Sequence, residues 1–234
     1  MIMAGWDDVP HLSEEDKENL MSSLPAHQRS ARSKGIPSLG AGAIYPVPED
    51  EIKCDPFEIP DYFKKAFGLD VGWNKTAAVF GAIDPDSDIL YLTSMHYRGH
   101  AEPSVHAAAI RARGEWIPGA IDPASRGRSQ KDGEALIDIY LDLGIDINPA
   151  INSVESGLYA VLERLSTGRL KVFSILTDWF TEYRVYQRDK NGKVKKSNDH
   201  AMDATRYLVM SGLELAKTKP FKKAERSPRS WRNN

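Results

Sequence analysis

The fold of this 234-residue chain is decided by the stretch Phe67-Gly68-Leu69-Asp70-Val71-Gly72-Trp73. Apolar side chains alternate along it, so that Phe67, Leu69 and Val71 point to one face of a β-strand and Asp70 to the other. Glycines flank the aspartate, and without a Cβ they let a second backbone, an ion or a phosphate come close to it. A carboxylate on a buried strand is costly unless a partner compensates its charge. Asp70 is therefore a candidate functional residue, although a turn cap or an ordinary ion pair would also explain it.

The composition is typical of a soluble globular protein, with 41% hydrophobic and 27% charged residues. A single cysteine, no apolar run of about 18 residues and no signal-peptide pattern predict a cytoplasmic protein without disulfides or membrane spans. The net charge of -2 does not indicate a polyanionic partner, but basic residues cluster locally. Residues 217–234 carry seven lysines and arginines against one glutamate, which fits either a phosphate-binding tail or a disordered, solvated one.

Residues 1–66 lack the regular pattern of a domain, and we interpret them as a linker. Ser13, with acidic residues after it, predicts the N-cap of a short helix. Gly35 and Gly40 have the spacing of a phosphate-binding loop, but Ala41 stands where that loop needs a lysine. The missing lysine excludes a nucleotide loop here.

A regular pattern begins at Phe67 and predicts one domain over residues 67–216, followed by the basic tail 217–234. Three strands in an antiparallel meander come first, and short strands then alternate with helices. The predicted strands are 43–47, 67–72, 76–84, 89–98, 119–122, 145–148 and 168–174, and the predicted helices are 13–23, 104–113, 132–143, 155–166 and 198–216. This order gives an α/β fold in which a mixed sheet, first antiparallel and then parallel, has helices on both faces.

A basic β-hairpin is predicted between the last strand and the last helix. Asn191-Gly192 is a strong two-residue turn signal, and it joins residues 186–188 to residues 194–196. Local basic patches can bind a phosphate backbone even in a protein of neutral balance. The candidate residues for this contact are Arg188, Lys190, Lys193, Lys195 and Lys196.

Two further aspartates occupy positions that would bring them to Asp70. Asp122 ends the short strand at 119–122, and Asp203 lies in the first turns of the last helix. The carboxyl ends of adjacent parallel strands meet at one edge of a sheet, and a helix crossing that edge can deliver a third carboxylate. Three clustered carboxylates repel one another unless a cation joins them. Oxygen ligands suit Mg²⁺ or Mn²⁺ rather than zinc, and two such ions about 4 Å apart can hydrolyse a phosphodiester.

Each of these residues also has a simpler explanation. Asp122 could form a turn with Pro123, and Asp203 could be a solvated helix residue. His200 could orient a ligand or a water, or could simply be exposed at the helix start. Asp199 lies one helical turn before Asp203, and we interpret it as a helix cap rather than a fourth ligand.

Four motifs carry a resemblance to a known family. They are Gly-Leu-Asp-Val-Gly-Trp at 68–73, Ile-Asp-Pro-Ala at 121–124, Gly157 with Leu-Glu-Arg-Leu-Ser-Thr-Gly-Arg-Leu-Lys-Val at 162–172, and Asn-Asp-His-Ala-Met-Asp-Ala-Thr-Arg-Tyr at 198–207. The chain resembles, from about Trp6 to Tyr207, the C-terminal nuclease domain of the large terminase subunit of tailed double-stranded DNA bacteriophages, in its headful-packaging branch. The resemblance implies a ribonuclease H-like fold and a metal-dependent endonuclease that cuts concatemeric viral DNA during packaging. It also implies that Asp70, Asp122 and Asp203 hold the metals.

The same resemblance implies partners and a location. The partners would be double-stranded DNA, the portal protein, the small terminase subunit and the ATPase domain of the same polypeptide, in the bacterial cytoplasm and transiently at the procapsid portal. The chain has no Walker-type ATPase motif, so we expect it to be a piece of a longer protein. The basic hairpin matches an insertion that either approaches DNA or controls access to the site.

Two other functions fit parts of the sequence. One is a non-catalytic docking module of the packaging motor whose aspartates bind no metal. The other is an actin-like or sugar-kinase-type ATP-binding domain, because Gly-Leu-Asp-Val-Gly before a hairpin resembles its first phosphate loop, although no second loop is found. For the nuclease, we expect weak cleavage without sequence specificity, since no base-reading element is present.

Overall fold

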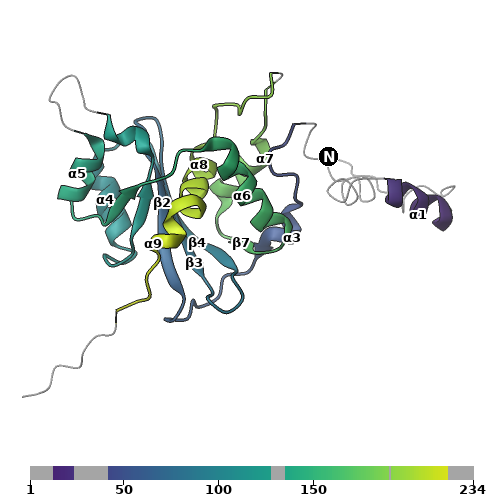
Figure 1. Cartoon of the computed structure of the whole chain (residues 1–234), viewed down its shortest axis with the longest axis horizontal. Coiled ribbons are helices and arrows are strands. Elements are labelled where there is room, and N and C mark those ends of the chain that lie inside the picture. The colour runs from purple at the N-terminus through teal and green to yellow at the C-terminus, as the bar shows by residue number, and fades with distance from the viewer. Residues whose placement is uncertain (1–12, 24–41, 128–134, 190, 221–234) are drawn as a thin grey trace, which may run out of the picture.

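A computed structural model describes residues 13–23, 42–127, 135–189 and 191–220 of the chain, and its main body is a mixed sheet with helices on both faces (Figure 1). The strands are β1 (Lys53–Cys54), β2 (Lys64–Asp70), β3 (Thr76–Ile83), β4 (Leu90–Arg98), β5 (Gly119–Ile121), β6 (Ile147–Pro149) and β7 (Leu170–Phe173). The helices are α1 (Glu14–Ser23), α3 (Glu49–Ile52), α4 (Pro103–Arg111), α5 (Leu136–Asp142), α6 (Val154–Ser166), α7 (Thr177–Val185), α8 (His200–Tyr207) and α9 (Leu213–Leu215), with a 3-10 turn η2 (Pro123–Arg126) and a π turn η3 (Leu208–Gly212). The predicted fold class is confirmed.

The sheet has seven strands in the order β1-β7-β4-β3-β2-β5-β6. Strand β3 runs antiparallel to both of its neighbours, and every other pair in the sheet is parallel. The carboxyl ends of β2, β5 and β6 therefore lie together at one edge of the sheet. This is the edge at which an open α/β sheet presents its ligand-binding residues.

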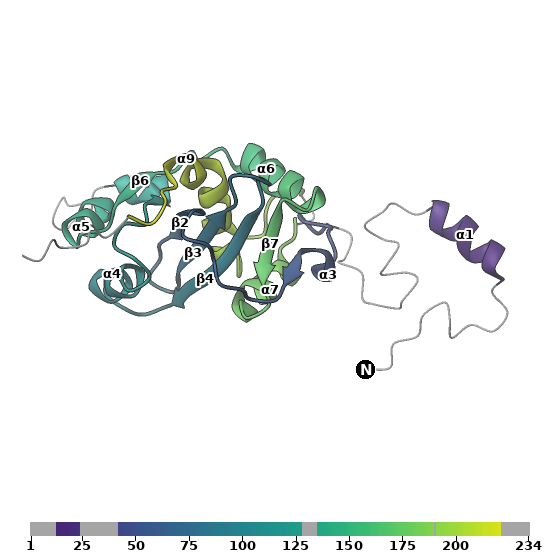
Figure 2. The same ribbon diagram turned by 90° about the horizontal axis from the view of Figure 1, so that it is seen from below.

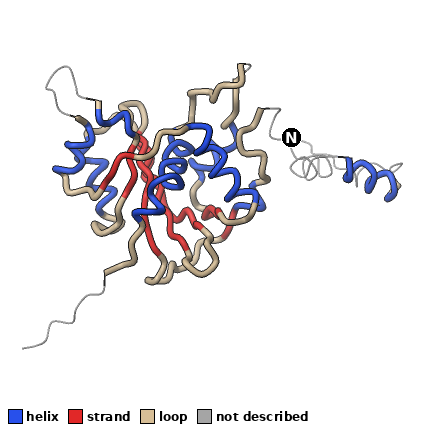
Figure 3. The backbone as a smooth tube through the Cα atoms, viewed as in Figure 1, coloured by secondary structure: helices blue, strands red, loops and turns tan. Residues whose placement is uncertain are grey.

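The sheet buries a different apolar layer on each face. Figure 2 shows the same ribbon from below. Along β2 and β3 the side chains alternate: Ala66 and Val79 join the larger layer under α6, α7 and α8, while Phe67 and Ala78 join the smaller layer under α4 and α5. Figure 3 shows the strands enclosed between these helices. This two-faced burial explains why β3 reads as a continuous apolar run.

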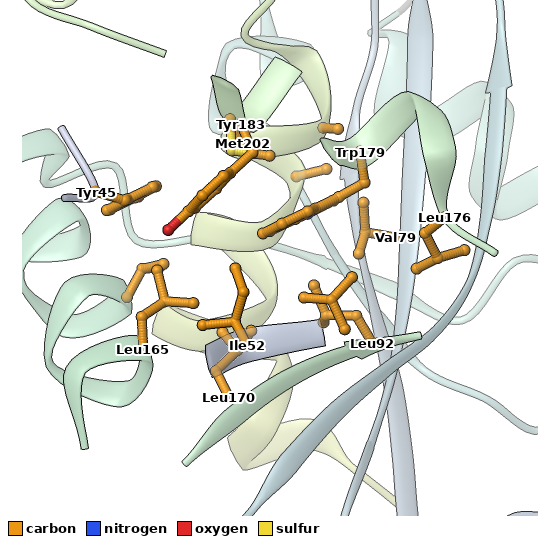
Figure 4. Close-up of a cluster of buried hydrophobic side chains, with 14 of the residues drawn as sticks. Tyr45, Ile52, Val79, Leu92, Leu165, Leu170, Leu176, Trp179, Tyr183 and Met202 are labelled. Carbon is orange, nitrogen blue, oxygen red and sulfur yellow. The ribbon is translucent and has the colours of Figure 1, made fainter. Parts of the chain in front are cut away.

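Helix α7 was not predicted from the sequence. It buries Trp179, Phe180 and Tyr183 against the larger apolar layer, and the rings of Trp179 and Tyr183 stack with centroids 5.0 Å apart (Figure 4). Threonine and aromatic residues favour strands over helices, so local propensity argued against the helix. Tertiary packing of one aromatic face decided otherwise.

The residues just before β2 pack into the same body, although the sequence assigned them to the linker 1–66. Tyr45 and Ile52 are buried in the larger layer, and the hydroxyl of Tyr183 donates to the carbonyl of Val47 at 2.8 Å. Strand β1 pairs with β7, and β2 begins at Lys64. The predicted division at residue 67 therefore falls inside a packed unit. The edge strand predicted at 43–47 is reduced to a single bridge between Ala43 and Gln187.

The remaining elements follow the sequence closely. The predicted helix at 13–23 is α1, where the backbone N–H of Asp16 donates to Oγ of Ser13 at 3.2 Å. The hairpin turns at Gly192, with φ of 77°, and Arg188 bridges to Val194. Lys190, the first residues of the helix predicted at 132–143, and the tail beyond residue 220 lie outside the described residues. Among the described helices, none is both long and apolar enough to cross a bilayer.

Candidate active site

Asp70 and Asp122 leave neighbouring strands at the same level. Strands β2 and β5 are parallel with Leu69 opposite Ile121, and the backbone N–H of Asp122 donates to the carbonyl of Leu69 at 2.9 Å. One oxygen of Asp122, Oδ1, accepts from the N–H of Ala124 at 3.0 Å and begins the turn η2. The two carboxylates therefore start from adjacent positions at the ligand-binding edge of the sheet.

Helix α8 brings Asp203 to this edge because Gly68 leaves no side chain in its way. A Cβ on Gly68 would stand 1.9 Å from the carbonyl oxygen of Ala204, the residue next to Asp203. Gly68 therefore allows the backbone of α8 to approach β2 closely. The sequence analysis named a second backbone as one of three groups that the glycines could admit. Burial raises the pKa of Asp70, and the charges of Asp203 and then Asp122 raise it further, so both carboxylates lie near enough to act on Asp70.

The acidity of Asp70 reflects its burial. Burial raises its pKa to about 6, against the lowering effect of a hydrogen bond from His200, whose Nδ1 lies 2.8 Å from Oδ2 of Asp70. The same bond raises the pKa of His200, because the carboxylate favours the protonated ring. The sequence left the role of His200 open, and the structure places it in contact with a candidate metal ligand.

Asp203 has a different cationic partner on each oxygen. Oδ1 accepts from Nη2 and Nε of Arg206 at 3.2 and 3.3 Å, and Oδ2 accepts from Nζ of Lys196 at 3.0 Å. Arg206 is 1% exposed, and its stem packs over Gly157 of α6, where a Cβ would stand 2.6 Å from it. Asp203 itself is buried, so the charge that it carries is fixed in position by the helix that bears it.

A glutamate that the sequence analysis did not identify holds the start of α8. Oε2 of the buried Glu182 accepts from the backbone N–H of Ala201 at 2.6 Å, and its Oε1 accepts from the hydroxyl of Tyr97 at 2.5 Å. Burial raises the pKa of Glu182. Asp199, interpreted from the sequence as the cap, stands at the N-cap position but makes no side-chain capping bond there; its carboxylate lies 3.3 Å from Nζ of Lys196. Asp199 is therefore the N-cap residue, as predicted, but its side chain does not cap the helix, and Glu182 on α7 accepts the N–H of Ala201 instead.

Tyr207 ends the last motif, but no pattern in the sequence assigned it a role at the site. Its ring is buried beneath the guanidinium of Arg206, with 4.6 Å from Cζ to the ring centroid. Burial raises the pKa of its hydroxyl, and the charges of Asp122, Asp203 and Asp70 raise it further. Tyr207 thus stays neutral and forms part of the wall beside the three carboxylates.

The carboxylates at this edge are suitable ligands for a hard divalent cation, although in this structure they do not form a complete coordination site. As they lie, no three acidic, histidine or cysteine side chains in the described part of the chain converge closely enough to hold an ion. Oδ2 of Asp70 faces His200 and Oδ2 of Asp203 faces the ammonium of Lys196. The three carboxylates at this edge nevertheless supply oxygen donors, the kind of ligand that Mg²⁺ and Mn²⁺ take.

The predicted DNA-binding residues of the hairpin separate into two groups. Lys193 and Lys195 are exposed, whereas Arg188 is bound to Glu155 through Nη2 at 2.7 Å. Lys196 points to Asp203 and Asp199 in the site. The charge pattern located this surface but could not separate free cations from paired ones.

Comparison with known proteins agrees with this geometry. The family model of the terminase RNaseH-like domain matches residues 67–211. The chain belongs to this family. It is 37% identical to the large terminase subunits of Enterobacteria phage LP7 and Salmonella phage P22, over 88% and 87% of its own length. It spans only 45% and 42% of those relatives. The family assignment decides against the ATP-binding alternative.

Solved terminase structures share the fold. The nuclease domain of the P22 large terminase aligns with a TM-score of 0.70 at 34% identity, covering 77% of this chain and 96% of that one. The large terminase nuclease of thermophilic phage G20c with bound magnesium aligns with a TM-score of 0.56 at 17% identity, covering 74% and 98%. The ribonuclease H-like fold expected from the motifs is therefore confirmed for this terminase domain.

Proposed function

We propose that this domain is a metal-dependent endonuclease that cuts concatemeric double-stranded viral DNA during genome packaging. The observation that carries the proposal is that Asp70 and Asp122 end the neighbouring parallel strands β2 and β5, while α8 crosses β2 at Gly68 beside Asp203. Membership of the terminase RNaseH-like family supports a nuclease, and the magnesium-bound relative supports a divalent ion. The three aspartates are the proposed ligands of Mg²⁺ or Mn²⁺, with two ions as the favoured number.

The residues around the ligands have distinct proposed roles. Ions held by the three aspartates would supply an activated water and stabilise the leaving oxygen of the phosphodiester. His200 orients Asp70 through its 2.8 Å contact, and Arg206 fixes Oδ1 of Asp203. Glu182 positions α8 by accepting from its first turn. These contacts hold the ligand oxygens in place before any ion arrives, which reduces the cost of ordering the site.

The proposed substrate is double-stranded DNA, and the proposed partners are other components of the packaging motor. Lys193 and Lys195 are exposed on the hairpin and suit contact with a DNA backbone, which carries no sequence information. The portal protein, the small terminase subunit and an ATPase domain of the longer polypeptide are the proposed partners, with cleavage at the procapsid portal in the host cytoplasm. We propose weak cleavage by this domain alone, without preference for one sequence.

The test uses supercoiled plasmid with Mg²⁺, Mn²⁺ or EDTA. Asp70→Asn and Asp203→Asn are compared with Asp138→Asn, which removes the same charge from an exposed position on α5. We expect metal-dependent nicking and linearisation by the wild type and Asp138→Asn, and loss in the two site variants. Because turnover is expected to be low, binding of Mn²⁺ is measured alongside by isothermal titration calorimetry.

The outcomes separate the nuclease from the docking module. A folded wild type that neither cuts DNA nor binds Mn²⁺ would favour the non-catalytic module. Retained cleavage in Asp70→Asn would remove Asp70 from the ligand set, and cutting at one defined sequence would contradict the proposed lack of specificity.

A further inference from the structure

Lys196 places a cation where the proposed metal ligands need one. Its Nζ lies 3.0 Å from Oδ2 of Asp203 and 3.3 Å from Oδ2 of Asp199. The carboxylate side chains are 10% and 9% exposed, whereas the side chain of Lys196 is 67% exposed. The ammonium therefore reaches into the site from a stem that stays in water. Its single positive charge lies between two largely buried acids.

The two cations on Asp203 differ in how firmly they are held. Arg206 belongs to α8 itself, is buried, and binds Oδ1 from one helical turn away. Lys196 precedes the helix and binds Oδ2, the oxygen that Arg206 leaves unused. Lys196 can withdraw into solvent by rotating its side chain, whereas Arg206 cannot leave without opening the core. Oδ2 is accordingly the oxygen that can change partners.

The segment that carries Lys196 joins the hairpin to α8 and is neither strand nor helix. In the hairpin, Arg188 bridges to Val194 and the N–H of Lys195 donates to the carbonyl of Gln187 at 3.0 Å. The chain enters α8 through Asn198 at φ of 53°. The side chain of Lys196 is 67% exposed, so its ammonium regains its hydration when it withdraws, and a divalent ion bound by several carboxylates can take its place. A lysine on such a segment can exchange without disturbing the sheet.

We propose that Lys196 is a tethered counterion that occupies the metal-facing oxygen of Asp203 in the metal-free protein and is displaced when a divalent ion binds. This inference rests on the proposed function and adds a regulatory role at the same site. The lysine keeps the carboxylates compensated and in place before loading, and it opposes binding of the ion by competing for Oδ2. After displacement its ammonium remains at the mouth of the site.

The test measures Mn²⁺ affinity by isothermal titration calorimetry for the wild type, Lys196→Gln and Lys195→Gln. The two variants remove one positive charge from adjacent exposed positions, so a general electrostatic effect appears in both. We expect Lys196→Gln to bind Mn²⁺ about three- to tenfold more tightly than Lys195→Gln, because it alone removes the competitor. Equal affinity in the two variants, or weaker binding by Lys196→Gln, would overturn the inference.

Thermal unfolding separates a counterion from a purely structural lysine. In EDTA, Lys196→Gln should unfold at a lower temperature than Lys195→Gln, since Asp203 and Asp199 lose a partner. Saturating Mn²⁺ should close that gap, because the ion then compensates Asp203 in both proteins. A gap that persists in Mn²⁺ contradicts the inference while leaving the proposed function intact. Absence of Mn²⁺ binding in the wild type and both variants would contradict the inference and the proposed function together.

Discussion

The two faces of the sheet each hold a histidine 2.8 Å from a partner, and their electrostatics are opposite. On the α8 face, His200 meets the carboxylate of Asp70, and the pKa of His200 is raised. On the α4 face, Nε2 of His96 meets Nδ1 of His106, and burial followed by the charge of its neighbours lowers the pKa of His96 to about 4. Where α8 crosses the sheet, buried charges are therefore paired with opposite charges, whereas on the α4 face the histidine pair is kept neutral.

The proposed active site requires buried charges, and the fold must supply partners for them. Buried charge is stable only where partners and close backbone contacts hold it, and these occur where α8 crosses β2. The α4 face has no such task and stabilises the sheet by ordinary packing. Substitutions of the same kind on the two faces should therefore have unequal consequences.

The largest difference is expected between the buried Arg206 and the partly buried Arg113. Arg206→Met leaves the buried Asp203 without one of its cations, and removing one partner of such a pair costs about 3 to 5 kcal/mol in free energy of unfolding. Arg113→Met on the α4 face leaves only neutral acceptors such as the carbonyl of Met95, at a cost of about 1 to 2 kcal/mol. Urea unfolding in EDTA measures both values. Equal losses would show that charge compensation at Asp203 contributes little.

The close crossing of α8 over β2 provides the next test. Gly68→Ala puts a methyl group against the carbonyl of Ala204, and we expect a loss of about 3 kcal/mol with weaker Mn²⁺ binding as the helix shifts. Gly144→Ala is the control: its φ is 79° but no atom stands within 4 Å, so strain alone should cost about 1 kcal/mol. Chemical denaturation and calorimetry give the two readouts. Unchanged Mn²⁺ affinity in Gly68→Ala would separate the helix crossing from the site.

The two histidine contacts should respond to pH with opposite signs. His96 has a lower pKa folded than unfolded, so its stabilising effect is present above the unfolded value of about 6.5 and is lost as the pH falls toward 4. Allowing for partial solvent exposure, wild type should lose about 1 kcal/mol more than His96→Gln between pH 7 and pH 5.

For His200 the folded pKa is raised, so its contribution is present below about 6.5 and is lost as the pH rises through the folded value. His200→Gln should therefore weaken the protein more at pH 6.5, where Asp70 with its pKa of about 6 is mostly ionised, than at pH 9. Unfolding midpoints of the wild type and both variants across this range provide the measurement. If the stabilising effects of His96 and His200 changed with pH in the same direction, the proposed contrast between the two faces would be contradicted.

The smallest effect on stability is expected at the hairpin. Replacing Lys193 and Lys195 together by alanine should change the free energy of unfolding by less than about 0.5 kcal/mol, because both are exposed. If the hairpin contacts DNA, the variant should bind DNA more weakly, and the slope of log affinity against log salt should fall by up to about 2. Lys64→Ala, at the opposite end of β2, is the control. Fluorescence anisotropy in Ca²⁺ measures binding, and an unchanged salt slope would assign the hairpin another role.

Much of the fold could be predicted because most of its elements have a clear local pattern. The alternation around Asp70, the meander to Arg98 and the helical spacing of α6 all appear in the structure within a few residues of the predicted bounds. Helix α7 could not be predicted in this way, because its aromatic residues are buried by packing against distant parts of the chain. Residues 43–54 were misassigned for the same reason, since their partners in β7 and α7 are more than a hundred positions away.

By itself, the sequence determined the order of strands and helices, the three acidic positions and the family, because alternation, turn residues and motif spacing are local properties. Only the tertiary structure decided which neighbours each acid meets. Glu182 reaches Ala201, Arg206 is fixed over Gly157, and Lys196 turns from the hairpin to Asp203. Burial and charge at a site depend on side chains that converge from separate elements, and no local pattern in the chain encodes that convergence.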